Sequence, residues 1–385
     1  MASIRKFRNS WQVRVSYVDK FGKQRTASKS GFKTKRQAQE YGTTLEYNYT
    51  HGGDLNNRNV DFIPYLIKWY QTFREPQLAD ATKSKYEYTI QVATNYFGKM
   101  KLKDINTTTY QKFLNLYGNG DGTTDHPAHA KATAEKINTH IRACVRNAIN
   151  DGIIHHDFTA NTHLVYDPSH TRGIHYLNVE QTSKLIKYLK GHLETGSIVN
   201  YMILTTLMTG MRASEVAALT WDSLDRKHLT LNINKSWDFI KKDFKATKNR
   251  TSNRVIDINH DLVDLLTKLQ FSQNMYLNTH HQENSKNLMF ITDRGSIPDY
   301  GTLNAQLKKA LQRAGIEAEL TFHGLRHTHA SILLFKGVPI AYISQRLGHE
   351  NISTTTRIYL HIIKELENKE SEKTTDYMDQ LLNIN

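Results

Sequence analysis

Hydrophobic and polar positions follow two different periods along the chain, and an alternating period opens the sequence. Near the start, apolar residues alternate with polar ones; they are Trp11, Val13, Val15 and Tyr17. This alternation is the period of a half-buried strand. A further strand is expected over Gln24–Ser30, and Thr34 followed by Gln37 is a capping-box signature for a helix that runs to about Tyr49. The pattern predicts a small three-stranded sheet backed by one helix.

From about residue 60 the apolar residues recur at helical spacing instead. Four segments show this period, namely Phe62–Tyr70, Tyr86–Tyr96, Tyr110–Leu116 and Ile137–Ile149. The stretch His51–Asn59 before them is rich in Gly and Asn and has no period, so it is interpreted as a linker. Gly118–Asp125 is expected to be a polar loop, and Asp167 with Pro168 marks a second boundary. The residues between the boundaries are expected to form a helical domain.

The C-terminal half of the chain combines both periods. A capped helix is expected over 178–193, and an apolar helix over Ile198–Met208 is stopped by Gly210. Leu229–Ile233 and Arg254–Ile258 are expected to be strands that flank a basic connection. The predicted fold class is multidomain α+β: a small three-stranded sheet with one helix, a helical domain, and a mixed, mainly helical domain with a small β-sheet.

Charge separates these regions further. The 385 residues include 51 Lys and Arg against 37 Asp and Glu, a formal net charge of +14. Residues 1–52 alone hold eleven basic against three acidic residues. A solvated basic face is the ordinary interpretation of such a surplus, but its density on a strand-rich segment favours DNA as the partner. The expected DNA contacts are Arg5, Lys6, Arg8, Arg14, Lys23 and Arg25.

Several classes of protein and site are excluded by composition. No stretch approaches the length of about 18 apolar residues needed to span a membrane, and the N-terminus lacks a signal-peptide core, so a cytoplasmic location is expected. The single cysteine, Cys144, forms no internal disulfide or cysteine-built zinc site and is expected to be a small core residue. His323, His327 and His329 lie close in sequence, but the neighbouring Arg326 would repel a cation. No metal site is expected.

Three short segments of the C-terminal half gather chemically useful side chains. Together they supply two arginines, two histidines and a tyrosine: Arg212, Arg326, His323, His349 and Tyr359. Arginine binds the non-bridging oxygens of a phosphodiester with a rigid, charged fork. A tyrosine hydroxyl needs a neighbouring base or positive charge to act as a nucleophile. The set suits phosphoryl transfer to a tyrosine, with Glu215, three residues after Arg212, expected to hold that guanidinium.

At these residues the chain resembles the tyrosine recombinases of the phage, or lambda-integrase-like, type. Arg212, the motif His323-x-x-Arg326, His349 and Tyr359 fall on the catalytic positions of that family, with Tyr359 as the nucleophile. The resemblance covers essentially the whole chain. It implies an arm-type DNA-binding domain over 1–52, a helical core-binding domain over 60–165 and a catalytic domain over 172–385.

The family also uses a lysine in a β-hairpin as the general acid toward the leaving 5′ oxygen, and the resemblance implies that this hairpin is the segment between Ile233 and Val255. The family pattern sets this lysine six residues before an arginine that opens the next strand, with a serine between them. Arg254 and Ser252 fit that pattern and select Lys248. The usual threonine after the lysine is replaced by Asn249, and Lys245 is the alternative.

The resemblance implies a site-specific recombinase that integrates or excises a mobile element, such as a prophage, through a 3′-phosphotyrosyl intermediate. No cofactor and no metal are expected. The implied partners are double-stranded DNA with core-type and arm-type sites, a homotetramer on that DNA, a host DNA-bending protein and a directionality factor. A type I topoisomerase-like nicking-closing enzyme and a catalytically silent DNA-binding regulator are the alternatives. The apolar face over Tyr377–Ile384 is expected to dock on a neighbouring protomer, or to fold back on its own domain.

Overall fold

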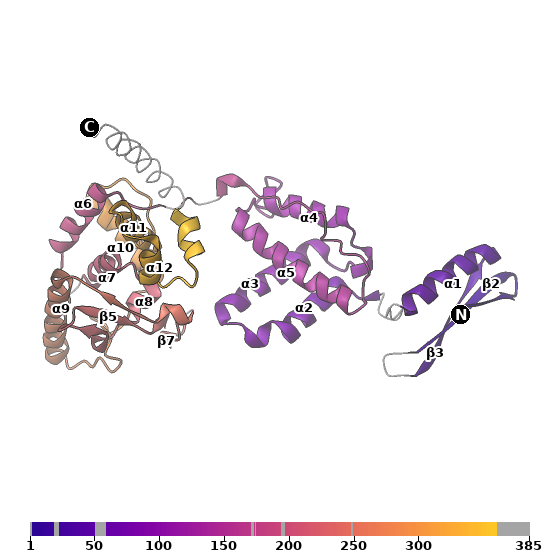
Figure 1. Ribbon diagram of the computed structural model, residues 1–385, viewed down its shortest axis with the longest axis horizontal. Helices are drawn as coiled ribbons and strands as arrows, with labels where there is room; N and C mark the ends of the chain where they lie inside the picture. The colour runs from indigo at the N-terminus through magenta and orange to yellow at the C-terminus, as the bar shows by residue number, and fades with distance from the viewer. Residues whose placement is uncertain are drawn as a thin grey trace, which may run out of the picture. The chain divides into compact units, whose positions relative to one another are not determined.

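The computed structural model describes residues 2–18, 23–50, 59–170, 173, 175–193, 197–247 and 249–359. Packing divides the chain into two compact units, Met1–Arg172 and Gly173–Asn385, each with hydrophobic cores of its own. Figure 1 follows the elements from indigo at the N-terminus to yellow at the C-terminal helices. No helix within the described ranges is long and apolar enough to cross a membrane.

The first unit begins with an antiparallel sheet in the order β1-β2-β3. Its elements are β1 (Ser3–Phe7), β2 (Ser10–Val18), β3 (Gln24–Phe32) and the helix α1 (Lys35–Thr50). The backbone N–H of Gln37 donates to Oγ1 of Thr34 at 3.2 Å, which caps the start of α1. Val13 and Val15 of β2 pack with Leu45 of α1 in a small core, because alternate strand residues face the helix. The predicted sheet with one helix is confirmed.

Among the described residues, the remainder of this unit is built mainly from four α-helices. They are α2 (Phe62–Phe73), α3 (Asp80–Phe97), α4 (Thr107–Asn119) and α5 (Lys131–Asn150). Each of the four segments with helical spacing lies inside one of them. Aromatic rings fill the core, with Phe62, Phe97, Tyr110 and Phe113 fully buried, and Cys144 is buried among apolar neighbours as expected.

The expected polar loop from Gly118 begins two residues too early, because α4 continues to Asn119 and ends at Gly120, whose φ is +67°. Gly118 lies inside the helix for a packing reason. A Cβ at this position would collide with the backbone carbonyl of Val165. Glycine therefore serves here as a close-approach residue and not as a helix terminator.

The second unit surrounds one apolar helix. Its helices are α6 (Val179–Lys190), α7 (Ile198–Thr209), α8 (Ala213–Ala217), α9 (His260–Thr279), α10 (Tyr300–Arg313), α11 (Phe322–Phe335) and α12 (Ile340–Leu347), followed by a helical segment at 352–359. α7 packs against α6, α8, α9, α10 and α11, and its side chains are almost all buried. This explains why α7 shows no polar face: a helix covered on all sides is apolar all round.

The strands of the second unit form two small sheets. β4 (Leu224–Asp225), β5 (Thr230–Ile233) and β8 (Arg254–Asp257) pair in that order, and β6 (Ser236–Asp238) pairs with β7 (Asp243–Lys245). The two predicted strands are confirmed within one residue. The hairpin β6–β7 lies between Ile233 and Val255, where the resemblance to the family implied a β-hairpin and the residue pattern alone indicated only a basic connection.

One helix end also differs from its prediction. α6 ends at Lys190, three residues before the expected position, although its capping box at Asn178 is present as predicted. Beyond Lys190 the ring Nδ1 of His192 lies 2.8 Å from the carbonyl oxygen of Tyr188. The imidazole of His192 thus contacts one of the last carbonyls of the helix, which lack intrahelical donors.

Candidate active site

The site begins where α7 ends. Gly210 takes a left-handed conformation, with φ +69°, and Arg212 is the N-cap of α8. A Cβ at Gly210 would approach His329 Cδ2 to 2.6 Å and Leu347 Cδ2 to 2.8 Å, so glycine is required both for the turn and for the close packing. This turn brings Arg212 beside α11 and α12, which follow more than a hundred residues later in the chain.

Glu215 holds Arg212 as the sequence predicted. The Nη1 of Arg212 donates to Oε1 of Glu215 at 2.6 Å, and the backbone N–H of Arg212 donates to Oε2 at 3.0 Å. The Nη2 of Arg212 reaches the carbonyl oxygen of Gly348 at 3.3 Å. The Arg212 side chain remains 24% exposed, whereas Glu215 is 3% exposed. The guanidinium of Arg212 is therefore held in place by Glu215 and remains partly exposed to solvent.

Arg254 shares the same carboxylate. Its Nη2 donates to Oε2 of Glu215 at 3.0 Å, and its Nη1 donates to the carbonyl oxygen of Ser252 at 2.9 Å. Burial by itself would raise the pKa of Glu215, but the charge and hydrogen bond of Arg254, with the charge of Arg212, hold that pKa below its usual range. Glu215 is therefore ionised at neutral pH and neutralises part of a strongly positive cluster.

Arg326 of α11 is the most deeply buried of the arginines, with 2% exposure. Its Nη1 donates to the carbonyl oxygen of Gly210 at 2.8 Å, and its Nη2 donates to that of Leu347 at 2.7 Å. Burial, together with the charge of Arg212, lowers the pKa of Arg326 to about 9. The guanidinium still carries its full charge at neutral pH.

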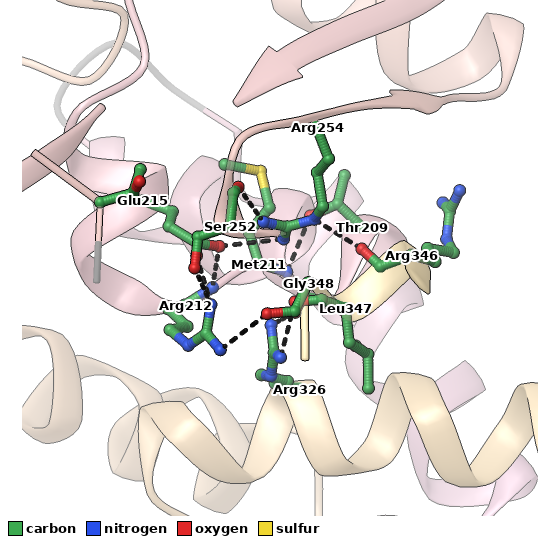
Figure 2. A network of polar contacts seen from close by, with 12 residues as sticks. Thr209, Met211, Arg212, Glu215, Ser252, Arg254, Arg326, Arg346, Leu347 and Gly348 are labelled. Atoms are coloured by element: carbon green, nitrogen blue, oxygen red, sulfur yellow. Dashed lines mark hydrogen bonds and ion pairs between the residues drawn. The ribbon is translucent and has the colours of Figure 1, made fainter. Parts of the chain in front are cut away.

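The C-terminal end of α12 receives three arginines in succession (Figure 2). The carbonyls of Arg346, Leu347 and Gly348 accept hydrogen bonds from Arg254, Arg326 and Arg212, at 2.6, 2.7 and 3.3 Å. The last carbonyls of a helix lack intrahelical donors and form the negative end of its dipole. They therefore suit guanidinium groups, and the helix end positions three side chains that come from distant segments.

The two predicted histidines lie beside this cluster. Burial and then the charges of Arg326 and Arg212 lower the pKa of His323. The same effects lower the pKa of His349 to about 3, and its Nδ1 lies 2.7 Å from Oγ1 of Thr355. Both imidazoles are therefore neutral at neutral pH, and each carries one N–H that can donate.

Tyr359 is buried against the same domain, with 2% exposure, in an apolar cluster that includes Leu334 and Leu347. Burial raises the pKa of its hydroxyl, although the charge of Arg326 acts in the opposite direction. The hydroxyl oxygen lies 2.9 Å from Nδ1 of His327. The sequence pointed to His327 only as a candidate metal ligand, and its contact with Tyr359 was not predicted. Its spacing of four from His323 was the available signal, because residues four apart share one helical face.

Lys248 lies outside the described residues, so its position relative to the cluster stays a prediction. Its neighbour Asn249 is described and donates from Nδ2 to Oε2 of Glu350 at 2.9 Å, next to His349 in sequence. The alternative, Lys245, lies on β7 and pairs with Asp238 at 3.2 Å. The segment Tyr377–Ile384 also lies outside the described residues.

Strand register sorts the predicted DNA contacts of the N-terminal sheet onto different surfaces. Arg5 is opposite Gln12, and Arg14 is opposite Ser3 and Ser28, all on the face away from Val13 and α1. The Nε of Arg5 donates to Oε1 of Gln12 at 2.9 Å.

The other four predicted contacts lie elsewhere. Lys6 pairs with Trp11, and Arg25 pairs with Tyr17. Both positions therefore lie on the face of the sheet that carries Val13 and is covered by α1. Arg8 lies in the turn between β1 and β2 with φ +53°, and Lys23 precedes β3. Arg5 and Arg14 are therefore the two that share the open face.

No group of three His, Cys, Asp or Glu side chains suited to a metal ion occurs in the described parts of the chain. A cavity of about 740 Å³ is lined by Ile198, Trp237 and Asp299, among other residues. Ile198 begins α7, whereas Gly210 follows its end, so this cavity lies at the other end of the helix from the arginine cluster.

Three family models match the chain in order. The arm DNA-binding domain matches residues 3–47, the N-terminal SAM-like domain of phage integrases matches 62–116, and the phage integrase family itself matches 175–365. The last of these contains the whole arginine cluster and Tyr359.

Individual proteins that resemble this chain are also recombinases and integrases. A tyrosine recombinase XerC-like protein of Caldanaerobacter subterraneus is 25% identical over 89% of this chain and 90% of its own length. A variant of the Tn1549 transposon integrase, solved in complex with transposon right end DNA, matches 82% of this chain and 99% of its own with a TM-score of 0.65 and 17% identity.

A lambda integrase tetramer bound to a Holliday junction matches 91% of this chain and 95% of its own, with a TM-score of 0.54 and 17% identity. At these identities the two structures establish the fold, and the family models and the curated relative establish the kinship. The chain belongs to the phage integrase family and is a tyrosine-type site-specific recombinase, an enzyme that breaks and rejoins DNA strands.

Proposed function

We propose that this recombinase integrates or excises a mobile element, such as a prophage, and that Tyr359 forms a 3′-phosphotyrosyl link to DNA. The observation that carries the proposal is the convergence of Arg212 and Arg326 on the end of α12, directly before His349. Tyr359 lies close enough to Arg326 for each to influence the pKa of the other. A phosphate bound by both arginines would therefore lie near a tyrosine hydroxyl.

Each proposed residue has a role that its surroundings support. Every guanidinium has five N–H donors, and the backbone and Glu215 contacts leave some of them available to the non-bridging oxygens of the scissile phosphate. His323 and His349, both neutral, donate further hydrogen bonds to that phosphate. Tyr359 Oη bonds to phosphorus, the bond from phosphorus to the 5′ oxygen breaks, and Lys248 protonates that oxygen.

The second half of the reaction reverses the first on a different strand. The free 5′-hydroxyl of a partner duplex attacks the phosphotyrosyl link, and the Tyr359 oxygen leaves. One phosphodiester replaces another of similar energy, so the cycle needs neither a nucleotide nor a redox cofactor. The arginines and Lys248 supply the positive charge that stabilises the transition state, which is the work a metal ion performs in other phosphoryl-transfer enzymes.

Three domains carry this function in our proposal: 1–52 for arm-type DNA, 60–165 for core-type DNA and 172–385 for catalysis. The matches to the arm DNA-binding and SAM-like models support the first two. A β-ribbon can enter the major groove, where Arg reads guanine and Gln reads adenine. Arg5, Gln12 and Arg14 on the open face suit base contacts, whereas Lys6, Arg8, Lys23 and Arg25 suit phosphates.

We further propose that four copies act together on two duplexes, as the similarity to the lambda integrase tetramer supports. A host DNA-bending protein and a directionality factor belong to the same proposal, as does a location in the bacterial cytoplasm. The segment Tyr377–Ile384 would connect neighbouring copies.

A nicked core-site duplex tests the proposal, because loss of the short cleaved strand traps the covalent intermediate. The wild-type chain should form a covalent adduct, and Tyr359→Phe should form none while it binds the same site equally well. An adduct formed by the Phe variant would remove Tyr359 as the nucleophile. Recombination between two sites, set beside relaxation of a plasmid without sites, separates an integrase from a topoisomerase. Absence of any adduct from the wild type would favour the silent regulator.

A further inference from the structure

The hydroxyl of Tyr359 is in contact with a base that none of the roles above employs. His327 Nδ1 lies 2.9 Å from the hydroxyl oxygen, a normal hydrogen-bond length for this pair. The two rings meet edge to face, with centroids 5.8 Å apart. The ring of His323, one helical turn earlier, packs against His327 in the same manner at 4.9 Å. The imidazole of His327 is thus held between the tyrosine and a second histidine.

We infer that His327 is the general base of strand cleavage: its Nδ1 accepts the hydrogen bond of the Tyr359 hydroxyl and takes its proton as the oxygen attacks phosphorus. This inference rests on the proposed role of Tyr359. With the imidazole proton on Nε2, the hydroxyl donates to Nδ1, and the lone pairs of its oxygen stay available for attack. A tyrosine whose hydroxyl is both oriented and deprotonated by one neighbour needs no free hydroxide.

The atoms balance in a single displacement. The O–H bond of Tyr359 breaks, and its proton goes to Nδ1 of His327, which becomes imidazolium. The oxygen forms a bond to phosphorus while the bond to the 5′ oxygen breaks, and Lys248 gives a proton to that oxygen. In the reverse step, imidazolium returns its proton to the departing tyrosine oxygen.

The groups around His327 keep it unprotonated before DNA binds. Burial, followed by the charges of His323 and Arg326, lowers the pKa of His327 to about 4. His349 also faces it from the segment after α12, and Tyr359 faces it from the helical segment 352–359. The bound phosphodiester brings a negative charge that favours imidazolium, so the base becomes stronger when the substrate is present.

The neighbouring histidines are less suited to this role. The Nδ1 of His349 is engaged by Oγ1 of Thr355 at 2.7 Å. His329, two residues after His327 on α11, is buried with its Nδ1 2.8 Å from the carbonyl oxygen of Leu207, and its Nε2 accepts from Arg346. His329 therefore ties α11 to α7 and serves as a structural control.

The test is the single-turnover rate of adduct formation on the nicked core site, measured with the full chain. His327→Ala should slow the reaction by about 100-fold or more, the usual contribution of a general base. His327→Asn keeps an acceptor near the position of Nδ1 but cannot take the proton, so it should remain slow. Added imidazole should restore part of the rate to His327→Ala and leave the wild type unchanged. Binding of the core site and thermal unfolding are measured for each variant.

Three outcomes separate the possibilities. A wild-type rate for His327→Asn would show that His327 only orients the hydroxyl, which overturns the general-base inference. Equal rates for His327→Ala and the wild type would overturn it as well. An adduct from Tyr359→Phe would instead refute the proposed nucleophile, whatever His327 does. His329→Asn should lower thermal stability and should not respond to imidazole; a response there would mean that rescue does not report the base.

Discussion

The arginine cluster of the second unit and the open face of the N-terminal sheet carry the same residue type in opposite settings. In the cluster, Arg254 and Arg326 are nearly buried, and each has backbone carbonyls as fixed partners. On the sheet, Arg5 and Arg14 are exposed, and the Nε of Arg5 donates to the side-chain oxygen of Gln12 on the same face. One region holds its arginines in place before DNA arrives, and the other leaves them to adapt.

The difference agrees with what each region recognises in the proposed function. A phosphorus atom in a displacement reaction tolerates little error in the position of its charge-stabilising groups, so those groups are fixed during folding. Sequence-specific and non-specific contacts to a duplex instead gain from counterion release and from side chains that can reach different base edges. Under the proposed function, the burial of an arginine in this protein indicates which of the two tasks it performs.

The largest expected effect concerns the centre of the cluster. Glu215→Ala leaves Arg254 buried without its carboxylate, and breaking a buried pair in this way costs about 3–5 kcal/mol of the free energy of unfolding. Chemical denaturation of the full chain measures this cost in the free energy of unfolding. Glu180→Ala, which breaks the exposed pair with Lys184, is the matched control, with an expected cost of at most about 1 kcal/mol. Similar costs for the two variants would contradict the difference between buried and exposed pairs.

Next in size is the loss of Arg212. Arg212→Ala should remove about 2.7–4 kcal/mol of transition-state stabilisation, the typical cost of losing one anion-stabilising donor. Arg212→Lys keeps a charge but lacks the fork that holds both Glu215 and the phosphate, so it should recover only part of the rate. Single-turnover cleavage with unchanged site binding is the measurement. A loss below tenfold for Arg212→Ala would mean that this arginine is structural.

A smaller effect is expected on the sheet. Arg14→Ala and Gln12→Ala should each lower arm-site affinity by about 1–3 kcal/mol and relax the preference for the correct base pair. Lys6→Ala should weaken binding to all sequences alike and reduce the salt slope by about one. Titrations on matched and mismatched duplexes at several salt concentrations separate the two classes. Equal loss of specificity in all three variants would show that register does not sort the contacts.

The smallest expected effect is a pH dependence. The pKa of Glu215 is below its usual range in the folded state, so its pairing stabilises the fold above the ordinary glutamate value of about 4.3. This stability should disappear as the pH falls through the folded pKa. Unfolding followed between pH 6 and 3 should therefore show a steeper loss for the wild type than for Glu215→Gln. Parallel curves would mean that Glu215 does not titrate at this site.

Sequence patterns predicted most of the elements because each pattern is local. The stop of α7 at Gly210, the capping box at Asn178 and the pairing of Arg212 with Glu215 all lie within four residues. The same patterns were less informative where contacts between residues far apart in the sequence determine the local structure. Glycine is needed at position 118 inside a helix because the backbone of Val165 passes close to it. The hydrophobic pattern of the neighbouring residues gives no sign of this contact.

The missed parts of the site have the same cause. His327 contacts a tyrosine 32 residues later, and Arg254 reaches a carbonyl 92 residues away. The hydrophobic pattern did not reveal the hairpin β6–β7, because its strands have three residues each, too few for an alternating period; the resemblance to the family implied it instead. Motif spacing identified the residues that we propose bind a phosphate, whereas the contacts that hold those residues appear only in the folded chain.

The most direct test of the account identifies the atom that joins protein to DNA. A trapped adduct on the nicked core site is digested with protease, and the peptide that carries the nucleotide is sequenced by mass spectrometry. The account predicts a phosphodiester between the hydroxyl of Tyr359 and the 3′ end of the cleaved strand, with a free 5′-hydroxyl on the released fragment. A link through any other residue, or to the 5′ end, would contradict it.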